Sequence, residues 1–218
     1  MHVALIGATG FVGSAVLDEL MARGHQVTAL LRDPDRLPAR AGLQRVRADV
    51  QDAGQVQAAV AGTEAVVSAF NAGWSNPNLY DDFVAGSRAI VAGTEAAGVP
   101  RYLVVGGAGS LLLADGTQLV DTPDFPADYH AGASAARQAL RDLQDGTPPL
   151  DWTFLSPPIA FHAGVENTRT GHYRVGQDHP LMAADGSPGT ISAADLAVAL
   201  VDELERPAHH RQRFTVAW

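Results

Sequence analysis

One stretch near the start of this 218-residue chain decides its fold: Val3-Ala4-Leu5-Ile6-Gly7-Ala8-Thr9-Gly10-Phe11-Val12-Gly13. The four apolar residues predict a buried strand, and the amphipathic stretch Phe11–Arg23 predicts a helix directly after it. Between them the glycines are spaced G-x-x-G-x-x-G. Gly7 can make the tight turn, Gly10 lets backbone approach a pyrophosphate, and Gly13 lets the helix pack closely on the strand. Unpaired N–H groups and the positive dipole end of the helix would then face the phosphates.

The same strand-then-helix pattern repeats along the chain. Further strands are predicted at Gln26–Leu31, Gln44–Ala48, Ala65–Ala69, Tyr102–Val105, Trp152–Leu155 and Arg213–Ala217. Helices are predicted at Ala53–Ala61, Leu79–Ala97, Tyr129–Leu143 and from Ser192 to about Glu205. The strands are continuously apolar, which is typical of a parallel sheet covered on both faces. With right-handed crossovers, this predicts one α/β domain over residues 1–218, a Rossmann-type doubly wound parallel sheet with helices on both faces.

Three segments qualify this reading. Residues 157–190 are rich in Gly, Pro and His, with short extended pieces such as His172–Val175, and are expected to form an irregular substrate-side segment within the domain. Gly146-Thr147-Pro148-Pro149 is expected to separate a helix from the next strand. Ser192 is a good N-cap with Asp195 three residues on. The apolar helix Leu196–Leu204 and the last strand could form a homodimer contact or belong to the core.

The end of the second strand bears on which nucleotide is bound. It reads Leu30-Leu31-Arg32-Asp33, where NAD-preferring sites place an acid for the ribose 2′-hydroxyl. Arg32, helped by Arg36, could hold a 2′-phosphate through charge-assisted hydrogen bonds. If Asp33 faced the ribose instead, the site would prefer NAD. We favour NADP(H).

Two further strand ends extend the predicted cofactor site. Asp49-Val50 follows the third strand, where an adenine edge would lie; Asp49 could accept from the exocyclic amine or only cap the next helix. Ala69-Phe70-Asn71 ends the fourth strand, at the switch-point crevice expected to hold the nicotinamide ribose. In the first turn, the residues expected to touch the cofactor are Gly7, Thr9, Gly10, Phe11 and Val12.

Composition excludes several function classes. The net charge of −9 argues against a nucleic-acid partner, which needs clustered positive charge. The chain has no cysteine, so it has no thiolate site, and its histidine spacing fits no metal motif, so no metal is expected. No apolar run is long enough for a membrane span, and no basic region precedes the first strand, so a cytoplasmic location is expected. The chain also lacks lysine entirely.

Several longer motifs together suggest a family. They are Val104-Val105-Gly106-Gly107-Ala108-Gly109-Ser110, Asp151-Trp152-Thr153-Phe154-Leu155-Ser156-Pro157 and Thr170-Gly171-His172-Tyr173-Arg174. With the glycine turn, they resemble the atypical short-chain dehydrogenases/reductases, in particular the NAD(P)H-binding group often labelled NADH–flavin reductases. NmrA-like sensors and biliverdin-IXβ reductases are more distant relatives. The resemblance implies cofactor contacts at Gly107, Ser156 and Pro157, and an active-site serine at Ser110.

The chain departs from that superfamily at its usual catalytic pair. Most short-chain dehydrogenases use Tyr-x-x-x-Lys, whereas Tyr129-His130-Ala131-Gly132-Ala133 has alanine in the lysine position. Ser110, Tyr129 and His130 remain as candidate catalytic residues, or as a satisfied loop serine, a packed tyrosine and a surface histidine. Because flavins and other conjugated rings accept hydride readily, we predict an NADPH-dependent reductase of a small-molecule acceptor such as FMN, FAD or a quinone. The alternative is a non-catalytic NADP(H)-binding redox sensor.

Overall fold

In the computed structural model, which describes residues 1–146 and 150–218, eight strands form one sheet. The strands are β1 (His2–Ile6), β2 (Gln26–Leu31), β3 (Leu43–Arg47), β4 (Ala65–Ser68), β5 (Arg101–Val105), β6 (Asp151–Ser156), β7 (Arg174–Gly176) and β8 (Gln212–Ala217). Their order is β3-β2-β1-β4-β5-β6-β8-β7, and only β7 runs antiparallel to its neighbour. The predicted doubly wound α/β fold is confirmed, because the order reverses between β1 and β4.

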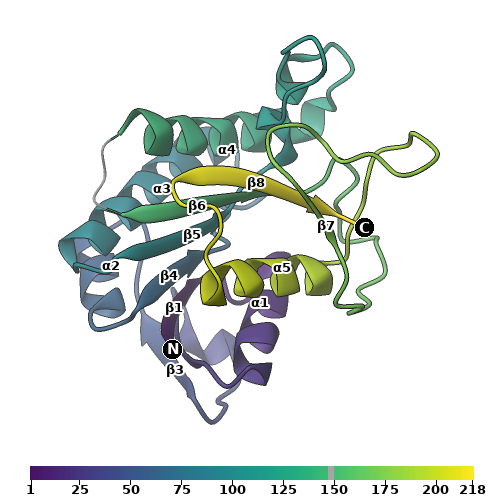
Figure 1. Cartoon of the computed structure of the whole chain (residues 1–218). Helices are drawn as coiled ribbons and strands as arrows, with labels where there is room; N and C mark the ends of the chain where they lie inside the picture. Colours follow the sequence, from purple (N-terminus) through teal and green to yellow (C-terminus); the bar gives the residue numbers. More distant parts are fainter. Residues whose placement is uncertain (147–149) are drawn as a thin grey trace.

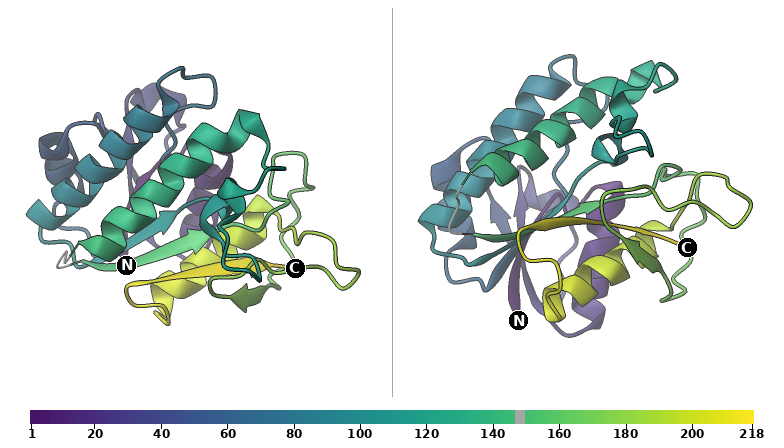
Figure 2. Two further views of the ribbon diagram at one scale, coloured as in Figure 1. Left: turned by 90° about the horizontal axis from the view of Figure 1, so that it is seen from above. Right: turned by 45° about the horizontal axis from the view of Figure 1, so that its top comes forward.

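Helices cover both faces of this sheet (Figure 1). They are α1 (Phe11–Ala22), α2 (Ala53–Val60), α3 (Leu79–Ala96), α4 (Ala127–Asp145) and α5 (Ala193–Glu205). Helices α1 and α5 pack together on one face, whereas α2, α3 and α4 lie on the other, with α3 and α4 side by side (Figure 2). Three short 3-10 turns are η1 (Pro34–Arg36), η2 (Ala108–Ser110) and η3 (Leu119–Asp121).

Two apolar layers fill the space between sheet and helices. Alternate residues of each central strand enter opposite layers: Leu155 faces α1 and α5, whereas Phe154 faces α3 and α4. Strands β1, β4, β5 and β6 are thus buried on both faces, which explains their continuous apolar sequence. Strand β3 is the exception, because it forms one edge of the sheet and exposes Arg45 and Arg47.

Helix α5 and strand β8 belong to the core of the chain. Almost every residue of Leu196–Leu204 is buried, and β8 lies between β6 and β7. Of the two readings left open for this apolar helix and strand, the core reading is the one that the structure supports. A homodimer stays a prediction, but the apolar residues of α5 and β8 are used within the chain.

The segment 157–190 is largely irregular, as predicted. Its middle runs along α1 and α5, where Arg169 forms a bidentate ion pair with Glu19 and the Tyr173 hydroxyl donates to Asp202 at 2.6 Å. A substrate-side role for this segment stays a prediction. The extended piece predicted at His172–Val175 forms as β7, at Arg174–Gly176.

Two helix ends carry local capping contacts, one of them at the predicted N-cap Ser192. Ser192 Oγ accepts from the Asp195 backbone N–H at 2.9 Å and starts α5. Gly24 follows α1 at a φ of +79°, and its N–H bonds to Met21 O at 3.0 Å. Gly146 caps the end of α4, and the remainder of the breaker predicted there, residues 147–149, lies outside the described residues.

The Asp195 carboxylate should make stability depend on pH. Burial by itself would raise its pKa, but hydrogen bonds from Thr170, Gly171 and Trp218 outweigh burial and lower the pKa. A group with a lowered folded-state pKa stabilises the fold above the ordinary value of about 3.9, and that stabilisation is lost as pH falls through the folded pKa.

We therefore expect Asp195→Asn to cost about 2 kcal/mol at pH 7, because an amide turns a donor toward buried donors. Chemical denaturation between pH 7 and pH 3 measures both effects. The variant should lose stability less steeply with acid than the native chain, whereas the exposed Asp145→Asn should behave like the native chain. Equal slopes for Asp195→Asn and the native chain would contradict this assignment.

Candidate functional site

Two glycines of the turn, Gly7 and Gly13, lie so close to neighbouring backbone that neither position has room for a side chain. Gly7 has a φ of +84°, and a Cβ there would lie 2.4 Å from Ala69 O on the neighbouring chain segment. A Cβ on Gly13 would lie 2.0 Å from Gly7 O. Gly10 N–H closes the turn by donating to Gly7 O at 2.9 Å. The roles predicted for these glycines in turning and close packing are therefore visible in the geometry.

The start of α1 offers free hydrogen-bond donors to the cleft. Gly10 is its N-cap and supplies no side-chain acceptor, so the first N–H groups of the helix are uncapped. Thr9, Gly10 and Phe11 are exposed, and Val12 is half-buried. Such a cradle, which a Cβ would fill, fits the pyrophosphate of a dinucleotide.

The arginines predicted for the 2′-phosphate lie at the edge of this cleft. Arg32 and Arg36 are exposed, and neither forms an ion pair within the described residues. The Asp33 carboxylate is used locally, because it caps η1 by accepting from the Asp35 N–H at 3.2 Å. Arg47, which the sequence reading missed, donates to Arg32 O at 2.9 Å.

The two residues after β3 take different positions. Asp49 is exposed, and its Oδ1 accepts from the Gln51 N–H at 3.0 Å in a local turn. The N-cap of α2 is Asp52, so the reading in which Asp49 caps that helix is wrong. The Asp52 carboxylate directly precedes the first turn of α2, and it accepts from the N–H groups of Gly54 and Gln55 there. Val50 is half-buried against the apolar layer below α2.

The residues after β4 run past the glycine turn. Ala69 N–H donates to Ile6 O at 3.0 Å, so this segment continues beside β1 beyond the end of β4. Phe70 stacks on Phe83 of α3 at 5.6 Å between ring centroids. Asn71 is exposed, and its Oδ1 accepts from the Gly73 N–H at 2.7 Å; its place near the cofactor ribose stays a prediction.

Ser110 is held by an arginine that sequence reasoning did not identify. The Arg213 guanidinium of β8 donates to Ser110 O at 2.6 Å and to Ser110 Oγ at 3.1 Å, and it also pairs with Asp178. Ser110 is only 1% exposed. Because Arg213 has no acceptor, Oγ accepts from it and keeps its own proton to donate elsewhere. Ser110 is therefore buried and does not lie open to solvent. A catalytic role for Ser110 stays a prediction.

The end of β6 brings buried polar groups to the same edge. Ser156 and Pro157 are buried, and Gly107 precedes η2 with its Cα close to Ala136 of α4. Within the described residues, Ser156 Oγ and its register neighbour Thr215 Oγ1 are buried without a hydrogen-bond partner. An unpartnered hydroxyl at the carboxyl end of a strand fits a polar part of a bound cofactor, because unpaired buried groups are costly.

The start of α4 presents the other catalytic candidates to solvent. Tyr129 and His130 are exposed; the Tyr129 ring meets Trp74 edge to face, and His130 Nδ1 lies 3.5 Å from Ser134 Oγ. Ala133, in the usual lysine position, packs against η2, since a Cβ on Gly109 would lie 2.9 Å from Ala133 Cβ. Position 109 therefore has no room for a side chain beside Ala133. Catalytic roles for Tyr129 and His130 stay predictions.

The structure also bears on metal sites and on membrane-spanning helices. Within residues 1–146 and 150–218, no group of three or more His, Cys, Asp or Glu side chains is placed to hold a metal ion. The adjacent histidines before β8 each contact a different carboxylate, His209 that of Glu203 and His210 that of Asp151. Over the same residues, none of the helices combines the length and the apolar character that crossing a membrane requires.

Known proteins with similar sequences extend over nearly the whole chain. The family model described as NAD(P)H-binding matches residues 7–207. The uncharacterised protein YwnB of Bacillus subtilis is 40% identical over 219 residues, covering 99% of this chain and 98% of YwnB.

Two solved structures are similar in both sequence and fold. A Bacteroides thetaiotaomicron protein, provisionally described as an epimerase, is 39% identical with a TM-score of 0.89, covering 100% of this chain and 96% of its own. A Streptococcus pneumoniae protein, provisionally described as an NADH-flavin reductase, is 32% identical with a TM-score of 0.86, covering 100% and 99%. The chain therefore belongs to the NAD(P)H-binding family of atypical short-chain dehydrogenases/reductases.

Proposed function

We propose that this protein uses NADPH to reduce a flavin, a quinone or a similar conjugated acceptor. The observation that carries the proposal is the contact between Ala133 and Gly109, which occupies the place of the usual catalytic lysine in a chain without any lysine. Without that cation, no lysine is available to assist Tyr129 as a proton donor. Reactions that depend on strong proton donation to an alkoxide, such as ketone reduction, are therefore disfavoured.

Reduction of a conjugated ring asks less of the protein. NADPH, when bound, supplies a hydride, and the acceptor takes up one proton, which leaves NADP⁺ and the reduced acceptor. The chain's own contribution is to hold the two rings together and to limit water around them. Tyr129 and His130 are exposed, so either can pass a proton from solvent. The Streptococcus pneumoniae relative, provisionally an NADH-flavin reductase, supports a flavin-type acceptor.

The preference for NADPH rests on the end of β2. Arg32 has no ion-pair partner among the described residues, whereas the Asp33 carboxylate is engaged in capping η1. A free guanidinium beside the adenosine ribose favours a 2′-phosphate, and a carboxylate turned away does not compete for the 2′-hydroxyl.

The first test is steady-state oxidation of NADPH with riboflavin, FMN and a simple quinone as separate acceptors. We expect saturable turnover with at least one of them above the enzyme-free rate. The competing reading, a redox sensor, is favoured by the same missing lysine. Tight NADPH binding with no turnover on any acceptor of these classes would overturn the reductase proposal and support the sensor.

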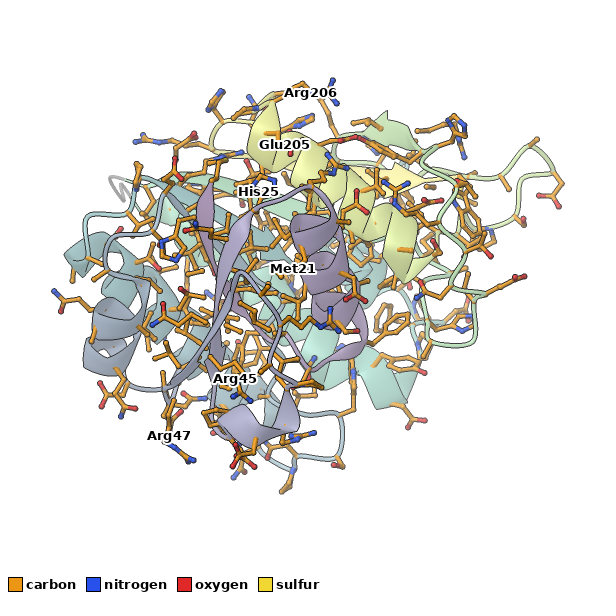
Figure 3. The ribbon with its side chains drawn as sticks, turned by 90° about the horizontal axis from the view of Figure 1, so that it is seen from below. Met21, His25, Arg45, Arg47, Glu205 and Arg206 are labelled. Atoms are coloured by element: carbon orange, nitrogen blue, oxygen red, sulfur yellow. The ribbon has the colours of Figure 1, made fainter. Side chains whose placement is uncertain are left out.

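The second test concerns the nucleotide. Arg32→Ala should raise the KM for NADPH about tenfold or more and leave that for NADH nearly unchanged, because a charge-assisted hydrogen bond contributes about 1.5–3 kcal/mol. Arg206→Ala is the control, since Arg206 follows α5 on the opposite side of the molecule from β3 (Figure 3). If Arg32→Ala raised the KM for NADH as much as the KM for NADPH, Arg32 would not be binding the 2′-phosphate.

A further inference from the structure

We infer that Trp74 and Tyr129 form the surface on which the acceptor ring binds, and that this surface selects uncharged planar acceptors over anionic flavin nucleotides. The inference rests on the proposed function and deepens it by naming the acceptor class. We call the pair, with the four carboxylates described below, the acceptor platform.

The aromatic pair is exposed but held in place. Trp74 is 60% exposed and Tyr129 is 53% exposed, with ring centroids 5.5 Å apart and ring planes at 89°. One edge of the indole rests on α4, because a Cβ on Gly132 would lie 2.8 Å from Trp74 Cζ3. An exposed large aromatic surface of this kind is costly unless it serves binding, and a fixed ring stacks with little loss of entropy.

Two chain segments connect the platform with the strand ends at the cofactor turn. Trp74 lies in the loop after β4, five residues beyond Ala69, which contacts Gly7 of the glycine turn. On its other side, Gly132 is followed by Ala133, which packs on Gly109 at the carboxyl end of β5. Both connections start from strands beside the switch point, where ligands of such sheets bind.

The segments that carry the two aromatic residues are acidic. Residues 71–82 and 122–132 contain four carboxylates and no lysine or arginine: Asp81, Asp82, Asp124 and Asp128. Asp81 and Asp82 are in the first turn of α3, and Asp128 is in the first turn of α4. Asp82 is tied to the loop that carries Trp74, because it accepts from Asn76 Nδ2 at 2.8 Å.

The acids oppose a phosphate group on the acceptor. An FMN molecule stacked on Trp74 would bring its doubly charged phosphate toward these acidic segments, whereas riboflavin or a quinone carries no charge to repel. The chain thus places arginines where the cofactor's phosphates are expected, at Arg32 and Arg36, and carboxylates where the acceptor is expected. Like-charge repulsion at exposed positions acts mainly on association and weakens with salt.

The charge test compares riboflavin with FMN, which share one ring system. We expect kcat/KM to be at least fivefold higher for riboflavin at low salt, and the ratio to fall as salt is raised. Asp128→Asn and Asp81→Asn should each raise kcat/KM for FMN and leave riboflavin unchanged. Glu95→Gln, at the far end of α3 from Asp81, removes the same charge and should leave the ratio unaltered. Equal kcat/KM for the two flavins, insensitive to salt and to Asp128→Asn, would overturn the charge argument.

The stacking test does not require turnover. Flavin fluorescence excited at wavelengths that tryptophan does not absorb should be quenched when riboflavin stacks on the protein without NADPH. Trp74→Ser should reduce this quenching and raise the KM for riboflavin with little change in kcat. Trp74→Phe should restore the KM but not the quenching, because a phenyl ring stacks on a flavin without donating an electron to its excited state. Trp218→Phe is the control, because the Trp218 indole is bonded to Asp195 instead.

The two inferences fail in different ways. If riboflavin binds and is quenched in a Trp74-dependent manner but no acceptor is reduced, the platform stands and the reductase proposal fails. If acceptors are reduced while Trp74→Ser leaves their KM and the quenching unchanged, the reductase stands and the platform is overturned. The dissociation constant for NADPH, measured in each variant, should not change, because Trp74 is outside the cofactor cradle.

Discussion

The close approach of three backbone segments at Gly7 is the constraint on which the rest of the structure depends. Gly7 O lies where a Cβ of Gly13 would be, and Gly7 itself lies against Ala69 O. These contacts seat α1 on β1 and bring the segment after β4 beside the turn. The same absence of side chains leaves the first N–H groups of α1 open to a phosphate. Packing of the sheet and binding of the cofactor therefore have one cause.

A second set of contacts holds the two ends of the chain together. Glu19 of α1 is buried, and its pKa is lowered mainly by hydrogen bonds from Arg169, which outweigh burial, with a smaller contribution from Arg23. Arg23 also pairs with Asp202 and Glu205 of α5. His25 bonds to Glu205 at 2.9 Å, and Figure 3 shows the two close together at the start of β2. Because these charges are partly buried, their pairing fixes how α5 and the 166–173 strap lie on α1.

The candidate site differs from that of most short-chain dehydrogenases because it has no lysine. Alanine at position 133 lies in close contact with Gly109 of η2, and it stands where most short-chain dehydrogenases have the catalytic lysine. Arg213 is the buried cation that does reach the strand ends, and it is used to hold Ser110 and Asp178. Charge is thus separated along the cleft, with arginines beyond β2 and β3 and carboxylates at the starts of α3 and α4.

The sequence by itself determined the sheet, the helices and the cofactor turn. Apolar runs and glycine spacing are local signals, so strand and helix limits were predicted to within about two residues, as for β2 at Gln26–Leu31. Tertiary structure alone decided which distant groups meet. The Arg213–Ser110 bond joins residues 103 positions apart, and Trp74 reaches Tyr129 only because α3 and α4 lie side by side. Likewise, the 166–173 strap follows α5 because Glu19, Asp195 and Asp202 offer buried acceptors there. Such contacts depend on side-chain directions after folding, and no local pattern of residues records them.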